Sequence, residues 1–382
     1  MEGTTKSRNN ETFQRPEFPK TLEGFGYHFT EEGELRNIET NDRFVFVIRE
    51  GDRAYNQAHY EALGDVIAQH IEDSLVTKYN FTRQPVPIEA ADDPTIPHSW
   101  IYLSPNSSKC KKLMLLIQGS GAVRPGQWAR QVIINDSLKM GSMFPYIEKA
   151  QEQDFGIIIF NPNVNFSSSI ERRRIEGSAT PPGHCLYVWK NFVRPAKAED
   201  IVIVAHSYGG ICTAHLIMEL GDEFCSRVKA IALTDSVHSK SWIREAMRPW
   251  FSRTAINWIT SSMPLDTSIP EAMEYNGCPC LSAGHKKHEY TSGTAFPAVF
   301  KFINNALTKP ASKPSDYSLK SESTLLDTVS TSLSQMLSST ASVVKSLFSL
   351  NWLQNTSQTQ TSNNQPPPGE PTAKPEQDKE DG

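Results

Sequence analysis

The stretch Ile201-Val202-Ile203-Val204-Ala205-His206-Ser207-Tyr208-Gly209-Gly210 decides the fold predicted for this chain. Its first five residues are apolar and four of them are β-branched, which is typical of a strand buried on both faces. Residues 211–220 follow with a helical pattern, and Ser207 lies in the sharp turn between the two elements. Ala205 and Gly209, two positions to either side, are small, as a close passage of strand and helix requires. The stretch therefore predicts a strained turn that exposes the Ser207 hydroxyl at the N-terminus of a helix.

This turn is typical of the nucleophile elbow of an α/β-hydrolase, although Ala205 stands where the motif usually has its first Gly. The alternative is a serine in a tight turn that is purely structural. The rest of the chain favours the hydrolase, because strand patterns alternate with helical ones. Strands are predicted at 100–103, 113–117, 156–160, 201–204, 228–233 and 280–283, and helices at 56–79, 145–153, 186–193 and 211–220. We therefore predict an α/β fold with a doubly wound, mostly parallel sheet that binds ligands at the carboxyl ends of its strands.

Composition divides the chain into three parts. Residues 1–15 are polar and predicted to be disordered, and residues 16–308 are predicted to form the α/β domain, with short strands at its N-terminal edge, including one at 44–47. Residues 309–382 form a low-complexity tail rich in Ser, Thr and Pro, which we expect to be disordered. Within the tail, apolar residues recur at helical spacing over 324–352 and predict an amphipathic helix. We expect that helix to dock on the domain; the alternatives are a helix that binds a partner and a helix that lies on a membrane surface.

Charge and cysteine usage exclude several classes of function. The net charge of −5 gives no basic field for direct binding of nucleic acid. The polar N-terminus lacks a signal-peptide core, and no run of eighteen apolar residues predicts a membrane span. Six scattered cysteines indicate reduced thiols rather than a disulfide framework, and they lack the spacing of a zinc site. We expect neither a metal nor a cofactor.

The elbow needs a base, an acid that orients the base, and donors for an oxyanion. α/β-Hydrolases supply them in the chain order Ser, Asp or Glu, then His. Asp235 follows the strand after Ser207, one strand earlier than the commoner placement; its alternative role is that of a turn residue. Three histidines remain as bases, His288, His285 and His238, and the residues alone do not choose between His288 and His285. We expected His206 to point away from Ser207.

The predicted oxyanion donors lie in a glycine-rich turn at the end of the strand at 113–117. One backbone N–H from the turn of Gly119, Ser120 and Gly121, together with that of Tyr208, forms the predicted pair of donors. The alternative is a simple tight loop.

Residues 18 to about 305 resemble the Argonaute-binding-protein-two domain family, in particular its cotranscriptional regulator branch. The matching segments are Phe18-Pro19, Leu22-Glu23-Gly24-Phe25, Tyr60-Glu61-Ala62-Leu63-Gly64, Gly119-Ser120-Gly121, Gly126-Gln127-Trp128-Ala129-Arg130, Asn161-Pro162-Asn163, Tyr187-Val188-Trp189, Ala205 to Gly210, Ala232 to His238, and His288-Glu289 with Thr291-Ser292. Alignment of the family's late motif falls on His288, so the resemblance ranks His288 first and leaves His285 and His238 as second choices. The chain departs from the family in having Gln118 where a His is usual, and in a shortened insertion at 165–185.

The resemblance implies a nuclear role, with the cytoplasm as the alternative location. It implies association with an Argonaute protein, a chromatin remodeller and spliceosome-associated proteins, and an influence on alternative splicing. The sequence therefore leaves two alternative functions. The chain is a cotranscriptional regulator with an α/β-hydrolase-like domain, or it is an active serine hydrolase (esterase, thioesterase or amidase) in which Ser207, His288 and Asp235 act together.

Overall fold

The structure is a computed structural model that describes residues 16–168 and 171–308. The predictions for residues 1–15, for the tail at 309–382 and for the helix at 324–352 concern parts of the chain outside the described residues. All described residues belong to one compact unit.

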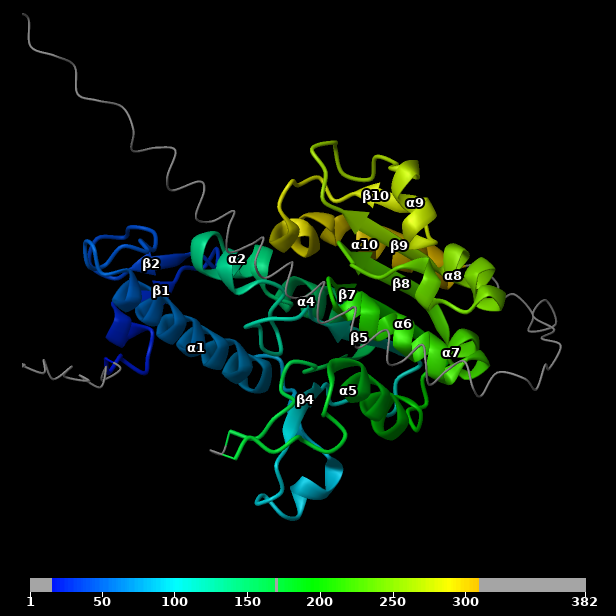
Figure 1. Cartoon of the computed structure of the whole chain (residues 1–382), viewed down its shortest axis with the longest axis horizontal. Helices are drawn as coiled ribbons and strands as arrows, with labels where there is room; N and C mark the ends of the chain where they lie inside the picture. Colours follow the sequence, from blue (N-terminus) through cyan, green and yellow to red (C-terminus); the bar gives the residue numbers. More distant parts are fainter. Residues whose placement is uncertain (1–15, 169–170, 309–382) are drawn as a thin grey trace, which may run out of the picture. The chain divides into compact units, whose positions relative to one another are not determined.

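Ten strands and ten α-helices form this unit (Figure 1). The strands are β1 (Tyr27–Phe29), β2 (Leu35–Asn37), β3 (Thr82–Val86), β4 (Ser99–Leu103), β5 (Lys112–Ile117), β6 (Phe155–Ile159), β7 (Asp200–His206), β8 (Val228–Thr234), β9 (Ala255–Ile259) and β10 (Cys280–Ser282). The helices are α1 (Arg53–Thr77), α2 (Arg130–Asn135), α3 (Leu138–Gly141), α4 (Phe144–Glu152), α5 (Pro181–Val188), α6 (Gly209–Leu220), α7 (Asp222–Arg227), α8 (Arg248–Thr254), α9 (Pro270–Asn276) and α10 (Thr291–Thr308). Shorter turns are η1 (Glu23–Phe25), η2 (Ile88–Ala91), η3 (Trp189–Val193), η4 (Lys240–Trp242), η5 (Glu245–Met247) and η6 (His288–Tyr290).

Eight strands form one sheet in the order β10-β9-β8-β7-β5-β6-β4-β3, and β1 and β2 form a separate hairpin. The six neighbouring strands from β10 to β6 pair in parallel, whereas β4 is antiparallel to both β6 and β3. Helices α4 and α10 cover one face, where Val202 and Val204 of β7 share a hydrophobic cluster with Tyr146 and Phe300. Because side chains alternate along a strand, Ile201 and Ile203 face the opposite layer. The predicted doubly wound, mostly parallel sheet is confirmed.

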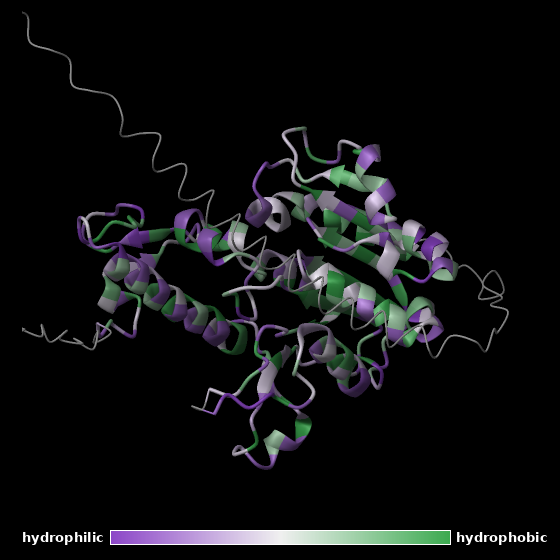
Figure 2. Cartoon of the chain, viewed as in Figure 1, coloured by the Kyte–Doolittle hydropathy of each residue, from purple (hydrophilic) through white to green (hydrophobic). Residues whose placement is uncertain are grey.

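The core strands are apolar because both faces of the sheet are covered. Every residue from Ile201 to His206 is buried, as are all five residues of β6. Figure 2 shows hydrophobic residues gathered in the strands of the sheet, while hydrophilic ones dominate the outer surface of α1. The buried sheet therefore fixes the positions of the loops that follow its strands.

Two local expectations fail. The strand predicted at 44–47 is absent, because only Arg43 pairs with Arg36, and Val45 and Val47 are 58% and 51% exposed. Conversely, β3 and β9 were not predicted from the sequence. β9 follows the short helix α8 directly, so no turn residues in the sequence mark where the helix ends and the strand begins. No helix among the described residues has the length and apolarity to cross a membrane.

Candidate active site

The turn between β7 and α6 holds Ser207 in a strained conformation. Its φ of 52° lies in the left-handed region, which a residue with a side chain seldom adopts. The turn is fixed from both sides, because the Ser207 N–H donates to the Thr234 carbonyl at 3.1 Å and the Ser207 carbonyl accepts from Gly210 N–H at 3.1 Å. A Cβ at Gly209 would lie 2.6 Å from the Ile117 carbonyl oxygen, so the helix can start here only with glycine. The elbow geometry that the sequence predicted is present.

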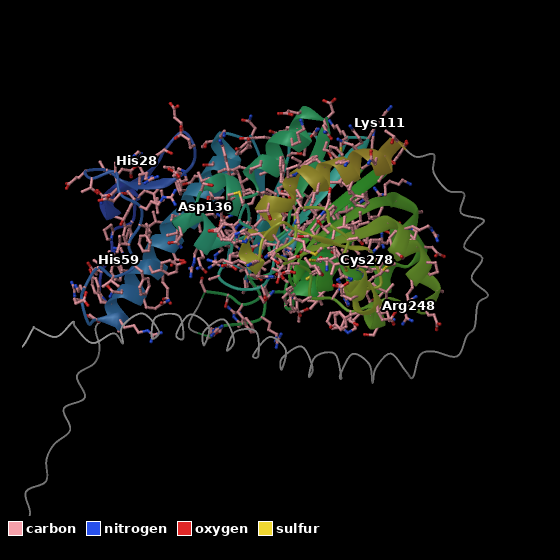
Figure 3. The ribbon with its side chains drawn as sticks, turned by 90° about the horizontal axis from the view of Figure 1, so that it is seen from above. His28, His59, Lys111, Asp136, Arg248 and Cys278 are labelled. Carbon is pink, nitrogen blue, oxygen red and sulfur yellow. The ribbon has the colours of Figure 1, made fainter. Side chains whose placement is uncertain are left out.

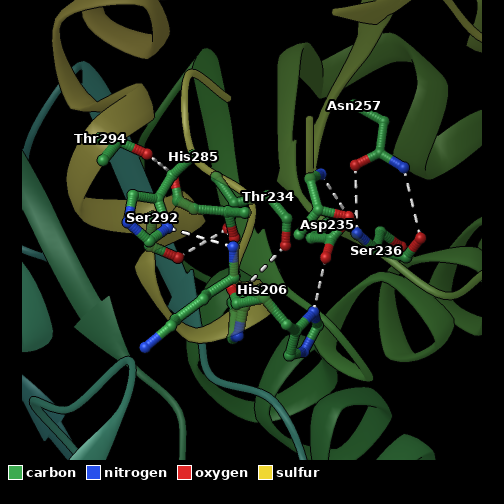
Figure 4. Close-up of polar contacts among 12 residues, drawn as sticks. His206, Thr234, Asp235, Ser236, Asn257, His285, Ser292 and Thr294 are labelled. Carbon is green, nitrogen blue, oxygen red and sulfur yellow. Dashed lines mark hydrogen bonds and ion pairs between the residues drawn. The ribbon is translucent and has the colours of Figure 1, made fainter. Parts of the chain in front are cut away.

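Asp235 follows β8 and also has a positive φ, 47°. Its Oδ1 accepts a hydrogen bond from the Thr260 N–H at 3.0 Å, and its Oδ2 lies 2.7 Å from Nδ1 of His288. Figure 4 shows Asp235 leaving the strand beside Ser236 and Asn257 and making this contact with an imidazole. Because the carboxylate accepts from Nδ1–H, Nε2 of the neutral imidazole is left as a proton acceptor. The acid and the first-ranked base therefore lie in direct contact.

His288 also lies next to the elbow. Its ring stacks on that of His206, the residue before Ser207, with centroids 4.6 Å apart and planes inclined by 36°. Among the described contacts, Ser207 and His288 do not share a hydrogen bond. Catalytic hydrogen bonds are often long or absent before substrate binds, so the role of His288 as the base stays a prediction.

The loop after β5 approaches the nucleophile closely. A Cβ at Gly119 would lie 2.9 Å from the Ser207 Cβ, so only glycine fits there. Asn163 holds the loop in place, because its Nδ2 donates to the Gly119 carbonyl at 2.9 Å and to the Val123 carbonyl at 3.2 Å. Within the described part of the chain, no hydrogen bond uses the backbone N–H of Gly119, Ser120, Gly121 or Tyr208. These four groups are available as the donors that the sequence analysis named.

The two second-choice bases have other contacts. His238 is fully buried, its Nε2–H donates to the Asn276 carbonyl at 3.0 Å, and its Nδ1 lies 2.7 Å from the Ser236 hydroxyl. Burial lowers the pKa of His238 to about 4. His285 stacks on Tyr290 at 4.3 Å, and its Nδ1 accepts from the Lys287 N–H. No described contact joins either imidazole to Asp235.

His206 lies beside His288, although no role in the site was predicted for it. Its ring packs against that of His288, and its Nδ1–H donates to the Thr234 carbonyl at 2.9 Å. The Thr234 hydroxyl in turn lies 2.7 Å from that of Ser292 on α10. Burial, and then the nearby charge of His288, lower the pKa of His206 to about 3, so the stacked partner of His288 is a neutral ring. Its position directly before the nucleophile was the only signal available in the sequence.

Other histidines and cysteines lie outside this arrangement. His59 packs against Phe18 and Phe25, and Figure 3 shows it with His28 at the end of the unit away from Cys278. Within residues 16–168 and 171–308, no group of three or more His, Cys, Asp or Glu side chains could hold a metal ion. All six cysteines are free.

The parallel-dominated sheet and the strained turn that holds Ser207 between β7 and α6 define a protein with an α/β-hydrolase-like fold. The family model of the Arb2 domain matches residues 18–265, and the chain belongs to that family. It is 38% identical over 345 residues to the "Cotranscriptional regulator ARB2A homolog" of Xenopus tropicalis, covering 76% of this chain and 81% of the relative. It is 37% identical over 343 residues to the "Cotranscriptional regulator ARB2A" of Homo sapiens, with the same two coverages. Among solved structures, the histone deacetylase Clr3 aligns with a TM-score of 0.45 at 17% identity, over 64% of this chain and 39% of that one.

Proposed function

We propose that this protein is a cotranscriptional regulator that acts in the nucleus. The observation that carries the proposal is the extent of the likeness to the ARB2A proteins, which spans most of both chains. Within that role, the resemblance to the Argonaute-binding family supports association with an Argonaute protein, a chromatin remodeller and spliceosome-associated proteins. The output would be a change in alternative splicing.

The regulatory role is tested in cells depleted of the protein. Re-expression of the full chain should return it to the nuclear fraction, recover Argonaute in its immunoprecipitate and restore the affected splice-site choices. Ser207→Ala should do the same if regulation needs only the folded domain. A full chain that stays outside the nucleus, or that recovers no Argonaute, contradicts the proposal.

A second function, that of a serine hydrolase, is supported by one specific observation: the 2.7 Å contact between Asp235 and His288 beside a strained serine elbow. In this proposal Ser207 Oγ attacks the carbonyl of an ester, thioester or amide, and His288 Nε2 takes the hydroxyl proton and later gives it to the leaving group. Asp235 holds the imidazole in the required tautomer and stabilises the imidazolium. Backbone N–H groups of Gly119 to Gly121 and of Tyr208 stabilise the oxyanion, each worth about 10²–10³ in rate.

Covalent labelling by a fluorophosphonate tests the hydrolase. The full chain should be labelled, and Ser207→Ala should lose all labelling, because no other serine in the site lies in an elbow. Ser262→Ala, at an exposed position, is the matched control and should label as fast as the wild type. Labelling that persists in Ser207→Ala, or that is absent from the wild-type protein, rules out the proposed nucleophile.

A further inference from the structure

A row of buried polar side chains crosses the carboxyl ends of the central strands. In the ladders, Leu116 of β5 pairs with Ile159 of β6. Just past these ladders, Gln118 follows the last residue of β5 and Asn161 lies two residues after the end of β6, while His206 is the last residue of β7. Asn163 Nδ2 donates to the Gly119 carbonyl at 2.9 Å and so holds the loops after β5 and β6 together. Gln118 and Asn161 are both fully buried.

Gln118 and Asn161 differ from other buried polar residues because their amides have no partner. Among the described residues, neither the nitrogen nor the oxygen of either side-chain amide makes a hydrogen bond. His206, the next residue in the row, is instead bonded to the Thr234 carbonyl. A buried polar atom without a partner costs about 1–3 kcal/mol, so four such atoms at the ends of two neighbouring strands call for a bound group that supplies their partners.

Two further unpaired donors lie in or next to the cluster that packs on these strands. Leu116 and Ile159, two residues before the two amides, belong to the cluster that also contains Trp128 and Tyr146. Gln118 and Asn161 come just past the strand ends, so we place them beside this cluster. Trp128 Nε1 and, next to it in the chain, Gln127 Nε2 are buried and make no hydrogen bond within the described part of the chain. None of these four side chains is charged.

The row begins next to the nucleophile. Gln118 precedes Gly119, whose own Cβ would come within 2.9 Å of the Ser207 Cβ. In the sheet order β8-β7-β5-β6, His288 is held from the β8 side by Asp235, whereas Gln118 and Asn161 lie on the β5 and β6 side. A leaving group must stay within reach of His288, which protonates it. The acyl group then extends to the opposite side, toward the two amides.

We propose that Gln118 and Asn161 form a buried subsite for an uncharged acyl group that both donates and accepts hydrogen bonds, such as one ending in a carboxamide; this rests on the proposed hydrolase. Each side-chain amide offers an NH2 group as donor and a carbonyl oxygen as acceptor, and Trp128 Nε1 adds a further donor. Together these groups complement a terminal –CONH2. An anionic acyl end has no countercharge among these side chains. An alkyl end leaves all four amide atoms unpaired, so the subsite discriminates against it.

Two p-nitrophenyl esters of equal shape test the subsite, the 5-amino-5-oxopentanoate and the 5-methylhexanoate, each corrected for spontaneous hydrolysis. In both reactions the Ser207 Oγ bonds to the acyl carbon as p-nitrophenolate leaves, and water then releases the carboxylic acid. We expect the full chain to prefer the amide ester in kcat/KM by at least tenfold. Asn161→Leu and Gln118→Met keep the side-chain volume. Each should make the alkyl ester the preferred substrate, by at least tenfold in kcat/KM.

The controls separate selectivity from folding and from catalysis. Asn305→Leu, at an exposed position of α10, should keep the wild-type preference. The melting temperatures of Asn161→Leu and Gln118→Met should equal or exceed that of the wild type, because the unpaired amides are removed. Equal hydrolysis of both esters by the wild type and both variants overturns the subsite while the hydrolase stands. If neither ester nor a fluorophosphonate reacts at Ser207, the hydrolase fails, and the subsite fails with it.

Discussion

Acidification should destabilise this protein steeply, because three histidines are buried in the neutral state. His184 and His206 have their pKa lowered to about 3 by burial, and His238 to about 4. At His184 a hydrogen bond adds to the effect of burial. His184 Nε2 accepts from the Asn161 N–H at 3.0 Å, so a proton on that nitrogen would place two donors face to face. At His238 the partner of Nδ1 is the Ser236 hydroxyl, which could rotate and accept, so burial accounts for the lowered pKa there.

The magnitude follows from proton linkage. An unfolded histidine titrates near pH 6.5, so below that pH the unfolded chain binds protons that the folded one refuses, and stability falls as pH falls. At pH 5.5 each buried histidine lowers the free energy of unfolding by about 1.4 kcal/mol, and the three together by about 4 kcal/mol. The contribution of the three neutral histidines to the free energy of unfolding is complete above pH 6.5. It is lost progressively as the pH falls from there toward pH 3–4. Since domains have about 5–15 kcal/mol in total, the loss is large.

Urea unfolding followed by tryptophan fluorescence at pH 7.5 and pH 5.5 measures this difference. His238→Gln should remove about a third of it. Glu72 acts in the opposite direction, because burial raises its pKa, so the comparison is repeated in Glu72→Gln, where the loss should be at least as large. A free energy of unfolding that changes by less than about 1 kcal/mol between the two pH values, in both backgrounds, would refute the reasoning.

Two substitutions test the site and its elbow separately. Asp235→Asn keeps a residue that tolerates a positive φ but removes the charge on His288, so fluorophosphonate labelling should slow by about 10³–10⁴ with little loss of stability, as measured by labelling kinetics and urea unfolding. Unchanged labelling would show that the carboxylate has no part in the chemistry. Gly210→Ala places a Cβ 1.7 Å from the Ser236 hydroxyl and displaces it from His238, so the free energy of unfolding should fall by about 1–3 kcal/mol. Combining it with Ser236→Gly should recover part of that loss, and no recovery would point to a different cause.

Local patterns predicted the elements with the strongest signals. Six of the eight strands of the main sheet were expected within one or two residues of their bounds, because buried parallel strands are short continuous apolar runs. The same rule gave the wrong result at 44–47, where Phe44 is buried but Val45 and Val47 are exposed. An apolar run forms a strand only where a neighbouring strand offers its backbone, and here only Arg43 found one.

The sequence by itself determined the elbow, because the strand, the serine and the small residues around it are contiguous from Ile201 to Gly210. It also determined the chain order of serine, carboxylate and histidine. Only the tertiary structure decided which imidazole meets Asp235, since His288 and His285 lie three residues apart and only their packing separates them. Likewise the ring contact of His206 with His288, and the position of Gln118 and Asn161 at the ends of neighbouring strands, depend on strand order and register. Such contacts join residues distant in the chain, and no local pattern of side chains encodes them.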